Sequence, residues 1–210
     1  MIPAEMQAAT LLVPRAVFSI DDPWELPAGV TPVPLRRATD GASPRLATSV
    51  AVWWDERYLS TLFAGDDDAV IASYFGHDEP LWQEDVVEIF VAPGAATRYF
   101  EIEVNPLGTV FDAVIDSPDG IRTTMVTDLG WTSEGLFAAT RRTPNHFTTI
   151  IRLPFESLGA TPAPGDPWRG NFFRIDRHPA RGDEFTAWQP TMRLPADFHV
   201  VAAFGEWWFA

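Results

Sequence analysis

The chain has 210 residues, of which 46% are hydrophobic, and a formal net charge of −14 from 15 basic and 29 acidic side chains. This hydrophobic fraction is enough to build a folded core, which excludes disorder as the main state, and the negative charge disfavours nucleic acid as a partner. The sequence has no cysteine, which excludes disulfides, thiol nucleophiles and thiolate metal sites, and it has nine tryptophans against three tyrosines.

The first residues, MIPAEMQAATLLVPRA, show no basic region before an apolar stretch, which is short and interrupted, so the pattern does not indicate a secretory signal. No segment approaches the roughly eighteen consecutive apolar residues of a membrane span. We therefore expect a loose tail over residues 1–14, one domain over residues 15–210, and no insertion into a membrane. The default expectation for the location is the cytoplasm; a chain trimmed from a longer secreted precursor would be periplasmic or extracellular.

Between frequent prolines and glycines, the chain alternates with period two and is rich in β-branched and aromatic residues, which predicts short strands. In chain order these are 49–54, 58–64, 85–91, 98–105, 109–115, 136–141, 147–153, 171–176, 185–188 and 199–209. Residues 154–159 instead predict a short helix, with proline at its start and glycine at its end. This spacing predicts an all-β fold, an antiparallel β-sandwich of the jelly-roll or immunoglobulin-like two-sheet type with one short helix.

Two neighbouring predicted strands place acidic side chains on a common face. Val87, Ile89 and Val91 share one face of strand 85–91, so Glu88 lies on the other. In strand 98–105, Glu101 and Glu103 oppose the apolar set. A short connection joins the two strands, which predicts a hairpin that gathers the three glutamates beside aromatic rings. The alternation of strand 171–176 leads us to expect Arg174 on a face that meets these acids.

Such a surface suits a sugar, because carboxylates and guanidinium groups can each make paired hydrogen bonds to neighbouring hydroxyls. The C–H face of a pyranose is apolar and packs flat on an indole. Trp82 lies in the loop just before the strand of Glu88, where an exposed ring would provide that platform. The alternative is a buried Trp82 that covers one end of the sandwich, as most tryptophans are largely buried.

Several runs carry a recognisable pattern, namely PLWQEDVVEIFV at 80–91, YFEIEVNPLGTVFD at 99–112, VWWDERYL at 52–59, LPFESLG at 153–159 and AWQPT at 187–191. Taken in their order along the chain, these runs resemble the family 9 carbohydrate-binding modules and their stand-alone relatives, which are DOMON-like β-sandwiches. The resemblance covers most of the chain from about residue 50 onward. It implies a non-catalytic protein that binds a mono- or oligosaccharide, or a polysaccharide chain end, often with structural calcium.

The resemblance also implies roles for particular residues. In sugar-binding members, a tryptophan before the acidic strand stacks on the ligand and a glutamate six residues later bonds its hydroxyls; Trp82 and Glu88 match these two positions. This chain departs from the pattern at Glu103, where the family has arginine, and at Met192, near which the family has a second tryptophan. Arg174 aligns with a polar amide of a late strand, so these five residues are the predicted carbohydrate site.

The sequence leaves three alternatives open. Glu88 with Glu103 or Asp112 would serve a glycosidase as acid and nucleophile or base, although two acids on adjacent strands also fit a solvated face or an ion pair. Acidic loops offer oxygen ligands for calcium, with Asp66, Asp68 and Asp112 as candidates, but none follows the spacing of a known calcium loop. The third alternative is a structural or interaction module that keeps the fold and has lost its sugar affinity.

Overall fold

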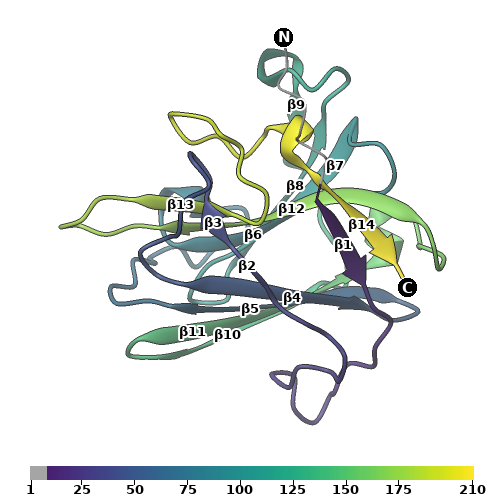
Figure 1. The fold of residues 1–210 in the computed structure, drawn as a ribbon, viewed down its shortest axis with the longest axis horizontal. Coiled ribbons are helices and arrows are strands. Elements are labelled where there is room, and N and C mark those ends of the chain that lie inside the picture. The colour runs from purple at the N-terminus through teal and green to yellow at the C-terminus, as the bar shows by residue number, and fades with distance from the viewer. Residues whose placement is uncertain (1–8) are drawn as a thin grey trace.

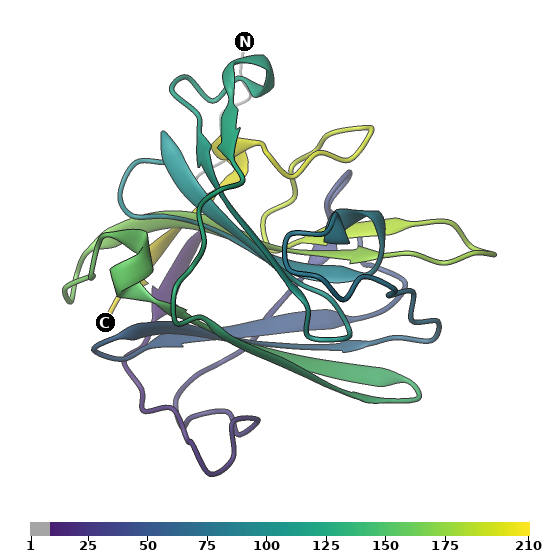
Figure 2. The same cartoon turned by 180° about the vertical axis from the view of Figure 1, so that it is seen from behind.

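Two β-sheets face each other across the core in the computed structural model, which describes residues 9–210 (Figures 1 and 2). The larger sheet has the order β1-β14-β12-β6-β7-β8-β9, with β13 beside β12 and β3 beside β13, and the smaller has the order β10-β11-β5-β4-β2. The strands are β1 (Thr10–Val13), β2 (Val33–Pro34), β3 (Arg36–Arg37), β4 (Thr48–Trp54), β5 (Tyr58–Asp66), β6 (Val86–Ala92), β7 (Arg98–Val104), β8 (Val110–Asp116), β9 (Val126–Asp128), β10 (Phe137–Thr143), β11 (His146–Pro154), β12 (Pro167–Asp176), β13 (Glu184–Ala187) and β14 (Gly205–Phe209).

The helical elements are all short. The α-helix α1 (Phe155–Leu158) begins after Pro154 and ends at Gly159, whose φ of +66° is left-handed, so the predicted helix is confirmed. Three 3₁₀ turns, η1 (Leu81–Gln83), η2 (Arg122–Thr124) and η3 (Val201–Ala203), lie in the connections between strands. Within residues 9–210, no helix is long and apolar enough to cross a membrane.

The larger sheet is covered by apolar groups on both faces. On its inner face, Val87 and Ile89 belong to the cluster that fills the space between the two sheets. On its outer face a second cluster forms, in which Phe173 of β12 stacks on Phe198 with ring centroids 4.2 Å apart. Phe198 belongs to the segment before β14, which is yellow in Figures 1 and 2. Polar side chains on the outer face of β6 and β7 are therefore buried as well.

The predicted sandwich and its long strands are confirmed, and two of the predicted boundaries are wrong. Residues 10–13 of the predicted tail form β1, which pairs in parallel with β14, and Leu11 and Val13 are buried in the inner core. Residues 1–8 of that tail lie outside the described residues. The predicted strand 199–209 is divided, because η3 precedes β14.

Arg174 lies between the two sheets, so the prediction that it meets the acidic face is wrong. β12 pairs with β6 such that Phe173 is directly opposite Glu88. Directly opposite residues share a face, which puts Phe173 and Ile175 on the side of Glu88 and turns Arg174 to the inner side. The predicted alternation of side chains along β12 is confirmed, but which of its two faces lies on the side of Glu88 depends on the register between β12 and β6.

The buried guanidinium of Arg174, which is 3% exposed, ties the two sheets together. It donates to the hydroxyl of Thr48 at 2.9 Å and to the backbone carbonyl of Asp66 at 2.7 Å, both from the smaller sheet. It also donates to the carboxylate of Asp176 at 2.8 Å and lies 3.4 Å from that of Asp67. The group therefore neutralises two buried carboxylates while it satisfies polar groups of the opposite sheet.

We expect Arg174→Met to lower the free energy of unfolding by about 3–5 kcal/mol, because it leaves Asp67 and Asp176 buried without their cation. Denaturant unfolding monitored by tryptophan fluorescence measures the loss. Arg98→Met is the matched control, because Arg98 pairs with Asp116 on the surface and its loss should cost about 1 kcal/mol or less. Equal effects of the two substitutions would contradict a structural role for the Arg174 pairs.

Candidate functional site

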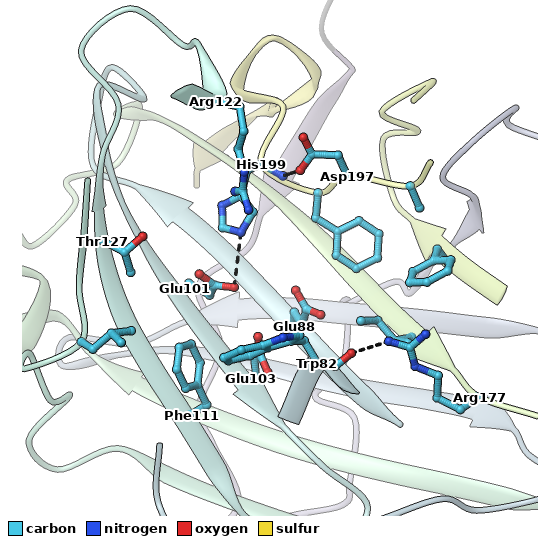
Figure 3. Close-up of a pocket in the computed structure, with 15 residues that line it drawn as sticks. Trp82, Glu88, Glu101, Glu103, Phe111, Arg122, Thr127, Arg177, Asp197 and His199 are labelled. Carbon is cyan, nitrogen blue, oxygen red and sulfur yellow. Dashed lines mark hydrogen bonds and ion pairs between the residues drawn. The ribbon is translucent and has the colours of Figure 1, made fainter. Parts of the chain in front are cut away.

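A pocket with a volume of about 410 Å³ lies on the outer face of the larger sheet (Figure 3). Its floor is formed by side chains of β6, β7 and β8, and its walls come from η1, η2, β9, the end of β12 and the segment before η3. The volume falls in the range of pockets that hold small molecules. The fold thus provides a concave surface at the place where the sequence predicted acids and rings.

Three glutamates form the floor of this pocket, and we call them the glutamate trio: Glu88, Glu101 and Glu103. Glu88 of β6 is directly opposite Glu103 of β7, and Glu101 is two residues away on the same face. One carboxylate oxygen from each lies within 4.8 Å of the others, and Figure 3 shows the three groups side by side. Glu88 is 2% and Glu103 is 1% exposed, and within residues 9–210 Oε1 of Glu88 and Oε2 of Glu103 have no hydrogen-bond partner.

The environment of the trio favours protonated carboxyl groups. Burial raises the pKa of Glu101 to about 7. Burial, and then the negative charge of Glu101, holds the pKa of Glu88 well above its usual range. Burial, and then the charges of Glu88 and Glu101, does the same to the pKa of Glu103. Near neutral pH the three groups therefore share protons, because close carboxylates in a dry site cannot all ionise.

His199 forms the wall above Glu101. Its Nδ1 lies 2.7 Å from the hydroxyl of Tyr99, and its Nε2 lies 3.8 Å from Oε1 of Glu101. Burial, and then the positive charge of Arg122, lowers the pKa of His199 to about 4, so the imidazole is neutral at pH 7. A neutral imidazole that accepts the Tyr99 proton at Nδ1 carries its own proton on Nε2, which faces the trio.

Trp82 stands at the mouth of the pocket with 42% of its surface exposed. Its indole contacts Phe111 edge to face, with ring centroids 5.1 Å apart. The 3₁₀ turn that carries Trp82 is held by Arg177, which donates to the Trp82 carbonyl at 2.6 Å (Figure 3). The ring is therefore fixed in position and half open to a ligand, in contrast to the alternative in which it is buried.

The structure brings some of the predicted site residues together and separates others from them. The structure brings Trp82, Glu88 and Glu103 together in the pocket. It does not place Arg174 there, because that side chain faces the inner core. It does not place Met192 there either, since this residue is 56% exposed and lies outside the pocket lining.

The sequence prediction missed Arg122, Arg177 and His199, which complete the pocket walls. All three lie in 3₁₀ turns or irregular segments outside the long strands, where no alternation assigns a direction to a side chain. No local signal in the sequence could have placed them beside the hairpin.

The three calcium candidates do not form one site. Asp68 is paired with Arg181, and Asp66 is exposed at the end of β5. The buried Asp112 lies on the inner side of β8, where its Oδ1 is 3.5 Å from Nε2 of His77. Calcium takes oxygen ligands, so an imidazole beside Asp112 does not fit it. Calcium stays a prediction of the resemblance, with no fitting site at these carboxylates.

Comparison with known proteins gives one family and several related folds. The model of carbohydrate-binding family 9 matches residues 44–209. A crystal structure of a candidate carbohydrate-binding protein from Bacteroides uniformis has a TM-score of 0.74 and 18% identity, and the match covers 97% of this chain and 100% of that one. No curated protein matches the chain.

Family 9 carbohydrate-binding modules from Caldicellulosiruptor kristjanssonii are similar as well. The module in complex with cellotriose and the module in complex with glucose each have a TM-score of 0.67 and 16% identity. These matches cover 96% of this chain and 93% and 96% of the modules, respectively. At this level of identity, the solved structures establish a common fold.

We expect the free energy of unfolding to fall as pH rises above about 6.5, because a carboxyl group whose pKa is raised by folding stabilises the native state only while it stays protonated. Glu103→Gln should weaken this dependence and raise the melting temperature at pH of about 8.5 by about 2–4 °C, the shift that corresponds to ~1 kcal/mol in a chain of this size. Thermal unfolding at several pH values measures both effects.

Two other groups do not disturb this comparison. His199, whose pKa is lowered by folding, affects the profile only below about pH 6.5. Asp85, whose pKa burial raises to about 7, contributes equally to both proteins. Glu156→Gln, on the exposed side of α1, is the control and should follow the wild-type profile. A Glu103→Gln profile parallel to that of the wild type would refute the raised pKa.

Proposed function

Since the chain belongs to carbohydrate-binding family 9, we propose that the outer-face pocket is its sugar-binding site. In this proposal, the protein binds a mono- or oligosaccharide, or the end of a polysaccharide chain, and leaves it intact. Trp82 is the stacking platform, and Glu88 and Glu103 accept hydrogen bonds from sugar hydroxyls. The family match covers β4 to β14, and thus every strand that contributes to the pocket.

The observation that carries this proposal is the juxtaposition of a half-exposed indole with buried acceptors that have no partner. Unpaired polar atoms in a dry site are costly, and a ligand that donates to Oε1 of Glu88 and Oε2 of Glu103 removes that cost. Sugar hydroxyls are such donors, while the apolar face of the same ring covers Trp82. One small ligand can therefore satisfy both parts of the pocket.

The relatives with bound ligands suggest which sugars to use as probes. The modules from Caldicellulosiruptor kristjanssonii were obtained in complex with cellotriose and with glucose. A pocket of about 410 Å³ accommodates a ligand of one or two rings. Glucose and cellotriose are therefore the first ligands to test with this protein.

The geometry favours binding over hydrolysis. A glycosidase needs one carboxyl group that is protonated and a second that stays ionised, in environments that push their pKa values apart. Here burial and mutual repulsion raise the pKa of Glu88 and of Glu103 alike. Asp112 cannot be the second acid, because Glu103 is directly opposite Phe111 and Asp112 faces the other side of the sheet.

We expect Trp82→Ala to weaken binding of glucose or cellotriose by about 1–3 kcal/mol, which is roughly a fivefold to 150-fold rise in Kd, because the stacking surface is lost. Isothermal titration calorimetry measures the change. Trp208→Ala is the matched control, since Trp208 is similarly exposed, at 37%, and lies outside the pocket. Unchanged affinity in Trp82→Ala would rule out the proposed platform.

We also expect no release of product from a panel of aryl glycosides and oligosaccharides under conditions where binding is measurable, because the trio offers no separated acid and base. A chromogenic assay and chromatography of the incubated sugars detect any turnover. Turnover that disappears in Glu103→Gln would show instead that the pocket is an active site.

A further inference from the structure

The pocket is lined by more acids than bases. Four carboxyl groups, those of the glutamate trio and Asp197, face two guanidinium groups, those of Arg122 and Arg177. Among residues 9–210, no ion pair joins either arginine to the trio. Arg177 is instead engaged by Asp183 and by the carbonyl of Trp82. Among the described residues, the trio thus has no ion pair with an arginine, and the charges of Arg177 and Arg122 offset only part of the rise that burial causes in the pKa of Glu88 and of Glu101.

Two other buried acids of this protein do have an ion-pair partner. Asp67 and Asp176 share the guanidinium of Arg174 between the sheets. In the trio, by contrast, Oε1 of Glu88 and Oε2 of Glu103 have no hydrogen-bond partner among residues 9–210, and both residues line the pocket and are at least 98% buried. A ligand that brings several donors and a positive charge would satisfy the trio in a way that the protein itself does not.

We propose that the pocket prefers a sugar that carries a free, protonated amine, that is, an amino sugar. This inference rests on the proposed function of the pocket as a sugar site. An ammonium group has three N–H donors on one nitrogen, which matches three carboxyl groups gathered within 4.8 Å of one another. A neutral hydroxyl brings one donor and no charge, whereas an ammonium group favours the ionised form of carboxyl groups that otherwise share protons. Hydrogen bonds in which the donor or the acceptor is ionised are about twice as strong as neutral ones.

The aromatic wall distinguishes an amino sugar from a simple cation. A metal ion would satisfy the trio but would leave Trp82 and Phe111 without a contact to the ligand. It would also fill only a small part of a pocket of about 410 Å³. An amino sugar places its amine on the trio and its ring beside the indole. The remaining polar groups at the walls, Arg122, Asp197 and His199, then face the hydroxyls of the ligand.

The test compares glucose, glucosamine and N-acetylglucosamine by calorimetry at pH of about 6.5. The three share one ring and differ at a single position, where glucosamine alone has a charge. We expect glucosamine to bind about tenfold more tightly than glucose, and N-acetylglucosamine to bind no more tightly than glucose. Glu103→Gln should reduce the ratio of the two affinities several-fold, and Glu101→Gln provides the same readout if the first variant does not fold.

Glu156→Gln on α1 is the control and should keep the wild-type ratio. Measurable glucose binding with no preference for glucosamine would overturn this inference and leave the proposed function intact. Absence of binding to all three sugars and to cellotriose would overturn both. A third outcome would identify the trio as a metal site and overturn the inference as well. In that case calcium or manganese, added without sugar, would raise the melting temperature of the wild type but not of Glu103→Gln, and the affinities for the sugars would be equal.

Discussion

The burial of three glutamates on one face of a sheet, with no arginine of the described residues in an ion pair with them, is the constraint on which the site depends. It arises because the outer face of the larger sheet is covered by a second apolar cluster, in which Phe173 stacks on Phe198. This cover helps to bury the carboxyl groups at the floor of the pocket but leaves the rim open at Trp82. Buried acceptors and an open ring are thus consequences of the same packing.

Much of the fold could be predicted from local sequence, because alternation reports directly on which side chains share a face of a strand. Alternation predicted the long strands and the common face of Glu88, Glu101 and Glu103, while proline and glycine at its two ends predicted α1. It could not assign Arg174, since the two faces of β12 become distinguishable only through its register with β6. It could not find β1 either, because that strand is defined by a parallel pair with β14 at the other end of the chain.

The residues of the candidate site, like the strands, could be predicted only where their positions depend on local pairing. The hairpin residues and Trp82 lie within a short span of sequence, so their meeting required only local pairing. Arg122, Arg177 and His199 come from turns and irregular segments that are brought in by tertiary packing. Family membership indicates the kind of ligand, and the acids of this chain indicate the charge that the ligand should carry. Glu103 stands where the resemblance implied a cation, and with Glu88 and Glu101 it makes the pocket floor acidic.

The ionisation of the trio and its response to a sugar can be observed directly by NMR of the glutamate side-chain carboxyl carbons in protein labelled with ¹³C. The account predicts three resonances that titrate well above the usual range for glutamate and that move when glucose or glucosamine is added. Resonances of Glu88, Glu101 and Glu103 that titrate with ordinary values, or that do not respond to any sugar that binds, would contradict it.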